Sequence, residues 1–126
     1  MTIEQFKAFE SKARELGYRK YPAPNRGDYA YYKSFGESAY EKGRSNYQVC
    51  LEVYEWVSYD KYTMTDYTSY SIAPIVYVSR TIDERYDLEL GSIKEDNIAE
   101  IEELAESFYH WVEQNVECKE KRYDDL

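Results

Sequence analysis

The side chains best suited to chemistry surround the single histidine of this 126-residue sequence. His110 lies four residues after Glu106 and three before Glu113, and these spacings make side chains neighbours on a helix. Carboxylates beside an imidazole could raise its pKa or contribute to a metal site. One exposed helix face, however, offers few ligands and no further residues to orient them. A solvated acidic face is the simpler interpretation, and we predict no metal and no cofactor.

No other combination of residues in the sequence indicates catalysis. Cys50 and Cys118 have no CxxC partner and no base nearby in the sequence. Glycine-rich phosphate loops, nucleophile motifs and zinc-ligand spacings are missing as well. Two cysteines without an N-terminal hydrophobic run predict free thiols in a non-enzymatic, cytoplasmic protein.

The acidic residues could serve binding instead. Twenty-five acidic and 16 basic residues give a net charge of −9, which disfavours direct binding to nucleic acids and to acidic membranes. Glu103, Glu106 and Glu113 face away from the apolar side of their predicted helix. They could imitate a phosphate backbone, so that the protein occupies the nucleic-acid site of another protein. A soluble, solvated helix face explains the same residues.

Aromatic residues are the most unusual feature of the composition, because 16 residues are tyrosine. Within residues 47–59, the odd positions 49, 51, 53 and 57 are aliphatic, whereas Tyr54 and Trp56 occupy even positions. This alternation predicts a strand with one aliphatic face and one aromatic face. The aliphatic face would form the core.

A hairpin loop at residues 63–66 would align this strand with the next one, over residues 70–80. Cross-strand partners would then have residue numbers that sum to 129, and the aliphatic residues of both strands would share one face. Tyr62 would pair with Tyr67. The opposite face would carry a candidate partner-binding surface made of Tyr54, Trp56, Tyr62, Tyr67 and Tyr77. Cross-strand stabilisation of the sheet, or burial under a helix, would explain the same rings without a partner.

Two helices and a sheet must position these residues. Thr2 with Gln5, and Ser92 with Glu95, predict capping boxes at the start of each helix, and Gly17 predicts the end of the first. Residues 28–35 form the first predicted strand, residues 86–91 a short fourth one, and residues 117–126 a frayed charged tail. The apolar stripe of the second helix comprises Ile98, Ile101, Leu104, Ala105, Phe108, Trp111 and Val112.

The sequence therefore predicts a single α+β domain over residues 1–126: a helix, a three- to four-stranded antiparallel meander and a second helix, with both helices on one face of the sheet. We expect a small acidic interaction module that binds an unidentified protein, or a second copy of itself, through the aromatic face around Trp56. The acidic mimic described above is one alternative. A carbohydrate-binding module, which would stack sugars on the same rings, is another. No segment resembles a membrane span.

Overall fold

The first helix begins and ends where its capping residues predict. In the computed structural model, which describes residues 1–35, 46–79, 85–91 and 97–116, helix α1 spans Ile3–Glu15. Thr2 and Gln5 form the capping box, each side chain accepting a hydrogen bond from the other residue's backbone N–H. Gly17 follows the helix with a φ of 96°, a left-handed conformation that glycine adopts at little cost.

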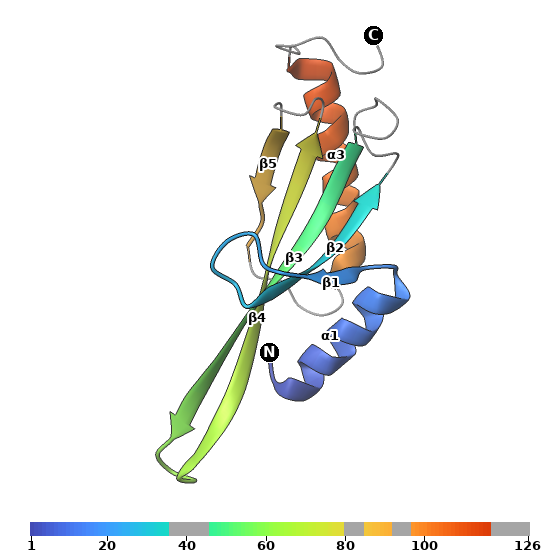
Figure 1. Ribbon diagram of the computed structural model, residues 1–126. Coiled ribbons are helices and arrows are strands. Elements are labelled where there is room, and N and C mark those ends of the chain that lie inside the picture. Colours follow the sequence, from blue (N-terminus) through green and yellow to red (C-terminus); the bar gives the residue numbers. More distant parts are fainter. Residues whose placement is uncertain (36–45, 80–84, 92–96, 117–126) are drawn as a thin grey trace.

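Among the described residues, the sheet is antiparallel and contains five strands rather than the predicted three or four (Figure 1). The strands lie in the order of the chain, so each one pairs with the next. The additional strand, β1, pairs with β2 through three residues shortly after α1, in a segment for which the sequence predicted neither helix nor strand. The strands are β1 (Arg19–Tyr21), β2 (Tyr29–Phe35), β3 (Asn46–Asp60), β4 (Thr65–Ser79) and β5 (Arg85–Glu89).

The last element, helix α3, spans Ile98–Asn115. Its N-cap residue is Asn97, which makes no side-chain capping bond. The predicted capping box of Ser92 and Glu95 is therefore not the start of α3, and both residues lie outside the described part of the chain, as do residues 117–126. Neither α1 nor α3 is long and apolar enough to cross a membrane.

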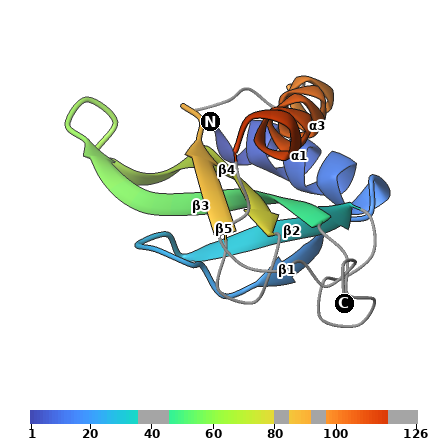
Figure 2. The ribbon, with the colours of Figure 1, turned by 90° about the horizontal axis from the view of Figure 1, so that it is seen from above.

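One buried cluster joins both helices to one face of the sheet, which we call the helix face. Odd-numbered residues of β3 and even-numbered residues of β4 contribute to it, and Figure 2 shows α1 and α3 on this side. Phe6 of α1 stacks on Tyr70 of β4, with ring centroids 4.1 Å apart. Members of the cluster from the two helices and the sheet include Phe6, Phe9, Ala13, Val49, Leu51, Val53, Ile72, Val76, Ile98, Ile101 and Ala105.

Strands β3 and β4 are much longer than their neighbours. Strand β2 pairs with β3 only as far as Val53, and β5 pairs with β4 only over Ile75–Ser79. The remaining parts of β3 and β4 pair with each other from Tyr54 and Ser71 to Asp60 and Thr65. Residues 54–71 therefore form a two-stranded extension, which we call the arm. At about 3.3 Å per residue the arm is roughly 20 Å long, and Figure 1 shows it projecting away from the rest of the sheet.

Candidate functional site

The turn at the tip of the arm determines the register of the hairpin. Asp60 pairs with Thr65, which leaves residues 61–64 as the loop instead of residues 63–66. The Asp60 carboxylate accepts hydrogen bonds from the backbone N–H groups of Tyr62 (2.8 Å) and Thr63 (3.4 Å). An aspartate that binds the backbone two and three residues ahead is a strong turn former. The last loop residue, Met64, has a positive φ of 55°.

This turn corrects the predicted register of the hairpin. Cross-strand partners sum to 125, as for Trp56 with Ser69, and not to 129. Tyr62 consequently lies in the turn, and Tyr67 lies opposite Ser58 instead of opposite Tyr62. Because the difference is even, every residue that remains in the ladder stays on its predicted face of the sheet. The predicted division into two faces is therefore confirmed, although the predicted pairs are wrong.

The arm exposes most of its large apolar side chains to solvent. Trp56 and Tyr67 lie on the side of the sheet opposite the helix face, which we call the far face, and are about half exposed. Val57 and Tyr59 lie on the helix face of the arm, and Tyr62 is at the tip. The exposed fractions are Trp56 47%, Val57 65%, Tyr59 57%, Tyr62 99%, Met64 75% and Tyr67 52%. The exposed surface therefore wraps around the arm instead of forming one flat face.

Two predicted members of the aromatic surface are less exposed than these residues. Tyr77 is only 6% exposed and belongs to a small buried cluster on the far face. Burial raises its pKa to about 12. Tyr54 is partly buried at the root of the arm. The structure thus keeps Trp56, Tyr62 and Tyr67 on the exposed arm and removes Tyr77 from the candidate surface.

The segment that connects β1 to β2 covers part of the far face. Its anchor is Glu52, a fully buried residue of β3. The Glu52 carboxylate accepts hydrogen bonds from the Gly27 backbone N–H (2.6 Å) and from Asn25 Nδ2 (3.2 Å). Neither Asn25 nor Gly27 was among the predicted site residues. A polar group buried in this way must be hydrogen-bonded. Because Asn25 and Gly27 supply the donors, these two hydrogen bonds hold the segment against the sheet.

The same segment ends at the root of the arm. The Asp28 backbone N–H donates to the Val53 carbonyl (2.8 Å), and the Asp28 carboxylate accepts from the Glu55 N–H (2.7 Å). These bonds show that the backbone groups of odd-numbered β3 residues point away from β4. Beyond Glu55, the corresponding groups of Val57 and Tyr59 form no bond with any strand of the described sheet. This edge of the arm is open.

The other edge of the arm is partly occupied. Met1 and Tyr70 exchange two backbone hydrogen bonds, from the Met1 amino group to the Tyr70 carbonyl (2.6 Å) and from the Tyr70 N–H to the Met1 carbonyl (3.0 Å). Met1 therefore forms a one-residue bridge on the β4 side. The sequence did not predict this bridge, because nothing in the alternation of β4 distinguishes its two edges.

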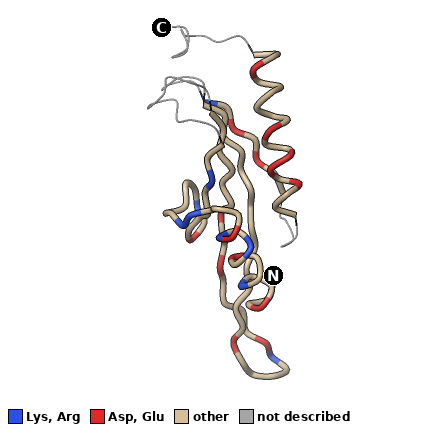
Figure 3. The backbone as a smooth tube through the Cα atoms, turned by 90° about the vertical axis from the view of Figure 1, so that its right-hand side faces the viewer, with Lys and Arg blue, Asp and Glu red and all other residues tan. Residues whose placement is uncertain are grey.

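The predicted acidic face of α3 is smaller in the structure. Glu103 and Glu106 are exposed, and Glu106 lies 3.6 Å from His110 Nε2. Glu113 is partly buried. Figure 3 shows acidic positions along the helix, which has no Lys or Arg between Ile98 and Asn115.

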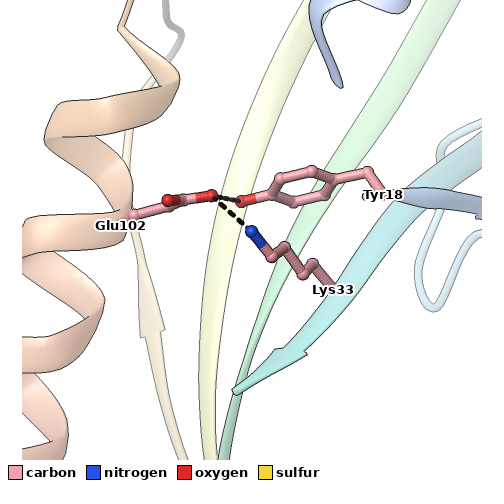
Figure 4. Close-up of polar contacts among 3 residues, drawn as sticks. All are labelled: Tyr18, Lys33 and Glu102. Atoms are coloured by element: carbon pink, nitrogen blue, oxygen red, sulfur yellow. Dashed lines mark hydrogen bonds and ion pairs between the residues drawn. The ribbon is translucent and has the colours of Figure 1, made fainter. Parts of the chain in front are cut away.

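A different glutamate of α3 has a structural role that the sequence did not indicate. Glu102 accepts a hydrogen bond from the Tyr18 hydroxyl (2.9 Å) and lies 3.6 Å from Lys33 Nζ (Figure 4). Burial, followed by the charge of Glu102, raises the pKa of Tyr18. This contact ties α3 to the end of α1 and to β2, so Glu102 is not available as a free acidic group.

Two further features bear on function. The predicted apolar stripe of α3 is not wholly buried, since Leu104 and Trp111 are 51% and 55% exposed.

On the far face, Tyr21 and Tyr32 pack edge to face and border an open depression of about 640 Å³, together with Arg19 and Gln48. Neither ring was among the predicted site residues.

The described residues provide little for catalysis by metals or thiols. They contain no group of three or more His, Cys, Asp or Glu side chains placed to hold a metal ion. Cys50 is buried, which raises the pKa of its thiol to about 11, and Cys118 lies outside the described residues. No protein-family model, curated protein or solved structure matches the chain. Its function has to be inferred from the residues and their arrangement.

Proposed function

We propose that this protein is a small acidic interaction module that binds a protein partner through its arm. One observation carries the proposal: the alternating apolar pattern of the core continues past the end of the core. Val49, Leu51 and Val53 are completely buried under the helices, whereas Val57, on the same face of the same strand, is 65% exposed. A partner on the arm would bury this continuation.

The residue types on the arm favour a protein partner. Trp56 and the three exposed tyrosines are the residues that protein interfaces most favour, because their rings give large contact areas at a low cost in conformational entropy. A cluster of exposed apolar side chains of this size is unusual on a monomer. The fold itself gains little from these exposed rings, since each cross-strand pair contributes only about 0.2–1 kcal/mol.

The two alternatives have weaker support. An acidic mimic needs an uninterrupted row of free carboxylates, whereas Glu102 is bound by Tyr18 and Lys33, and Glu113 is partly buried. A carbohydrate module needs rings that share one platform, and those of the arm lie on two faces and at the tip. A sugar would fit better beside Tyr21 and Tyr32. We keep the cytoplasm as the proposed location.

An armless variant provides the first test. Replacing residues 57–68 by Asn-Gly, together with Trp56→Ala, joins residue 56 to Ser69, which already face each other with their backbone groups directed inward, through a two-residue turn that suits a hairpin. This variant retains the stacking of Phe6 on Tyr70. We expect a folded protein by circular dichroism. When the immobilised variant is exposed to extract of its native host, it should no longer capture the proteins that the immobilised wild-type chain captures specifically.

A matched pair of surface variants identifies the surface responsible. Trp56→Ala with Tyr67→Ala alters the arm, and Leu104→Ala with Trp111→Ala alters the other exposed apolar patch. The proposal requires that quantitative mass spectrometry shows loss of the captured proteins for the first variant only. Loss that follows the α3 variant would assign binding to the helix. The acidic mimic would be supported if Glu103→Lys with Glu106→Lys abolished capture, and if capture by the wild-type chain disappeared in high salt.

A further inference from the structure

From the open edge of β3, we infer that the arm's partner is a second copy of this chain, paired edge to edge around a two-fold axis at Val57. This inference rests on the proposed function and specifies its partner. A two-stranded ribbon is only marginally stable by itself, and an open strand edge is a template for a further strand. Among the described residues, Met1 occupies both backbone groups of Tyr70 at the root of the β4 edge, whereas on the β3 edge Asp28 occupies only the N–H of Glu55, so the open positions of β3 begin at the Glu55 carbonyl.

The direction of the backbone groups selects the register of this pairing. In an antiparallel pair centred on Val57, residue numbers of the two copies sum to 114, so Glu55 faces Tyr59 of the second copy. The Val57 residues exchange two hydrogen bonds. The Tyr59 N–H of each copy donates to the Glu55 carbonyl of the other, whereas the Glu55 N–H is already bound to Asp28. This register uses every open backbone group between Glu55 and Tyr59 except the Tyr59 carbonyl, which faces the N–H that Asp28 binds.

The side chains fit the same register. On the far face, Ser58 of one copy lies between its own Tyr67 and Trp56 of the second copy, so that two large rings meet over a small residue. On the helix face, the Val57 side chains meet each other. No acidic residue faces another acidic residue, because Glu55 faces Tyr59 and Asp60 faces Tyr54. Like charges directly opposite each other would destabilise the pair.

The available area matches that of a stable dimer. A fully open aromatic side chain presents about 150–250 Å², so the exposed fractions of Trp56 and the three tyrosines leave roughly 500 Å² per copy, to which exposed Val57 and Met64 add. A specific interface of standard size buries about that area on each partner. With two arms side by side in opposite directions, the tip of each arm reaches the root of the other, so the tip residues Tyr62 and Met64 are included.

Charge gives the dimer a distinctive dependence on salt. Each copy carries a net charge of −9, so the two copies repel each other at low ionic strength, and salt screens this repulsion. The dimer should therefore tighten as salt is added. Binding to a cationic partner would weaken under the same conditions.

A pair of proline variants tests the edge. The Val57 N–H points away from β4, so Val57→Pro leaves the hairpin ladder intact and removes a donor from the open edge. Thr68 faces Val57 on the same rung, and Thr68→Pro makes the corresponding change on the other edge. In sedimentation equilibrium, wild type and Thr68→Pro should dimerise, and Val57→Pro should dimerise about tenfold more weakly or not at all.

A charge swap tests the two-fold axis. Val57→Lys and Val57→Glu should each be monomeric, because like charges meet at the axis, and their mixture should form a heterodimer. A wild-type chain that stays monomeric at all concentrations and salt levels would overturn the inference. A dimer that persists in Val57→Pro would overturn the β3 edge. Arm-dependent capture of another protein by a strictly monomeric chain would leave the proposed function standing, whereas arm variants without any effect would refute both.

Discussion

Gly27 offers the sharpest test of how the far face is covered. A Cβ atom at this position would lie 2.5 Å from Glu52 Cγ, 2.7 Å from Glu52 Oε1 and 2.9 Å from the Val53 carbonyl oxygen. These separations are well inside van der Waals contact, so Gly27→Ala requires something to move. Either Glu52 leaves its place, or the segment that carries Gly27 lifts from the sheet.

The expected cost follows from these two responses. Overpacking of a closely fitted site costs about 1–3 kcal/mol. Movement of either group also weakens the 2.6 Å bond from the Gly27 N–H to the carboxylate, and a hydrogen bond to such an acceptor contributes about 1.5–3 kcal/mol. We expect Gly27→Ala to lower the free energy of unfolding by about 2–5 kcal/mol, a large part of the roughly 5–15 kcal/mol typical of a domain.

Urea unfolding, followed by circular dichroism, would measure this loss, and the other glycines supply matched controls. A methyl group added at Gly91 would have nothing within 4 Å, so Gly91→Ala should change the free energy of unfolding by no more than about 0.5 kcal/mol. Gly17→Ala has ordinary space, 3.9 Å to Lys33 Cε, but a φ of 96°. It should cost about 1–2 kcal/mol for backbone conformation alone.

A double-mutant cycle isolates the contact itself. Glu52→Ala removes the two closest atoms and leaves only the Val53 carbonyl near the added methyl group. Gly27→Ala should then cost at least about 1 kcal/mol less in the Glu52→Ala background than in the wild-type chain. Equal costs in both backgrounds would refute the reasoning, because the segment would then not be held against Glu52 as described. So would a rank order in which Gly17 or Gly91 is the more sensitive position.

Three further predictions concern single groups. Tyr18→Phe removes the hydrogen bond to Glu102 and should lower the free energy of unfolding in urea by about 1–2 kcal/mol. Burial raises the pKa values of Tyr31 and Tyr77 to about 12, from 10.0; the unfolded chain therefore loses these protons first, and stability should fall as pH rises from 10 to 12. Tyr31→Phe or Tyr77→Phe should each flatten that fall by up to about 1.4 kcal/mol per pH unit. Met64→Gly relieves the positive φ at the tip, and hydrogen exchange of the arm amides should slow by up to roughly fivefold.

Local signals allowed the first helix to be predicted closely. The groups that cap α1 are three residues apart in the sequence, and Gly17 ends the helix without any distant contact. Strand β1 could not be found in the same way. Its three residues are all exposed, and one is followed directly by Pro22, so no alternation distinguishes them from a connector. Pairing with β2 makes them a strand.

The far face could not be predicted because its cover comes from a distant segment. Glu52 reads as a polar residue on a solvated face until Gly27 and Asn25 bring donors to it from 25 and 27 residues away. Nothing in the alternation of β3 shows that its polar face is solvated at one end and covered at another. The alternation also places Tyr77 on the candidate surface, because it does not show the far-face cluster that buries this ring or Arg85 of β5, which lies 4.6 Å from the ring centroid.

The hairpin shows which errors in register matter for function. The predicted loop is displaced by two residues, because the sequence pattern does not show the hydrogen bonds of Asp60 to the backbone of the turn. A displacement by one residue would have exchanged the two faces, and with them the core and the surface. A displacement of the loop by two residues changes only which residues are cross-strand partners, and leaves each of them on the same face. Trp56 and Tyr67 therefore remain on the face where the alternation placed them, although their neighbours differ.

The end of the core, however, is not encoded in that alternation. From Val49 to Tyr59 the helix face of β3 continues with aliphatic and aromatic residues, interrupted at Glu55, and only the lengths of α1, β2 and β5 determine where burial stops. Past that point the same pattern becomes exposed surface, beside a strand edge that is open beyond Glu55, where Asp28 makes the last hydrogen bond to β3. A second arm, placed edge to edge, supplies both of the missing elements: a strand for the edge and side chains for the two faces. If Val57→Pro and Thr68→Pro dimerise to the same extent, no second strand pairs with the β3 edge. A partner must then bind to the two faces of the arm instead.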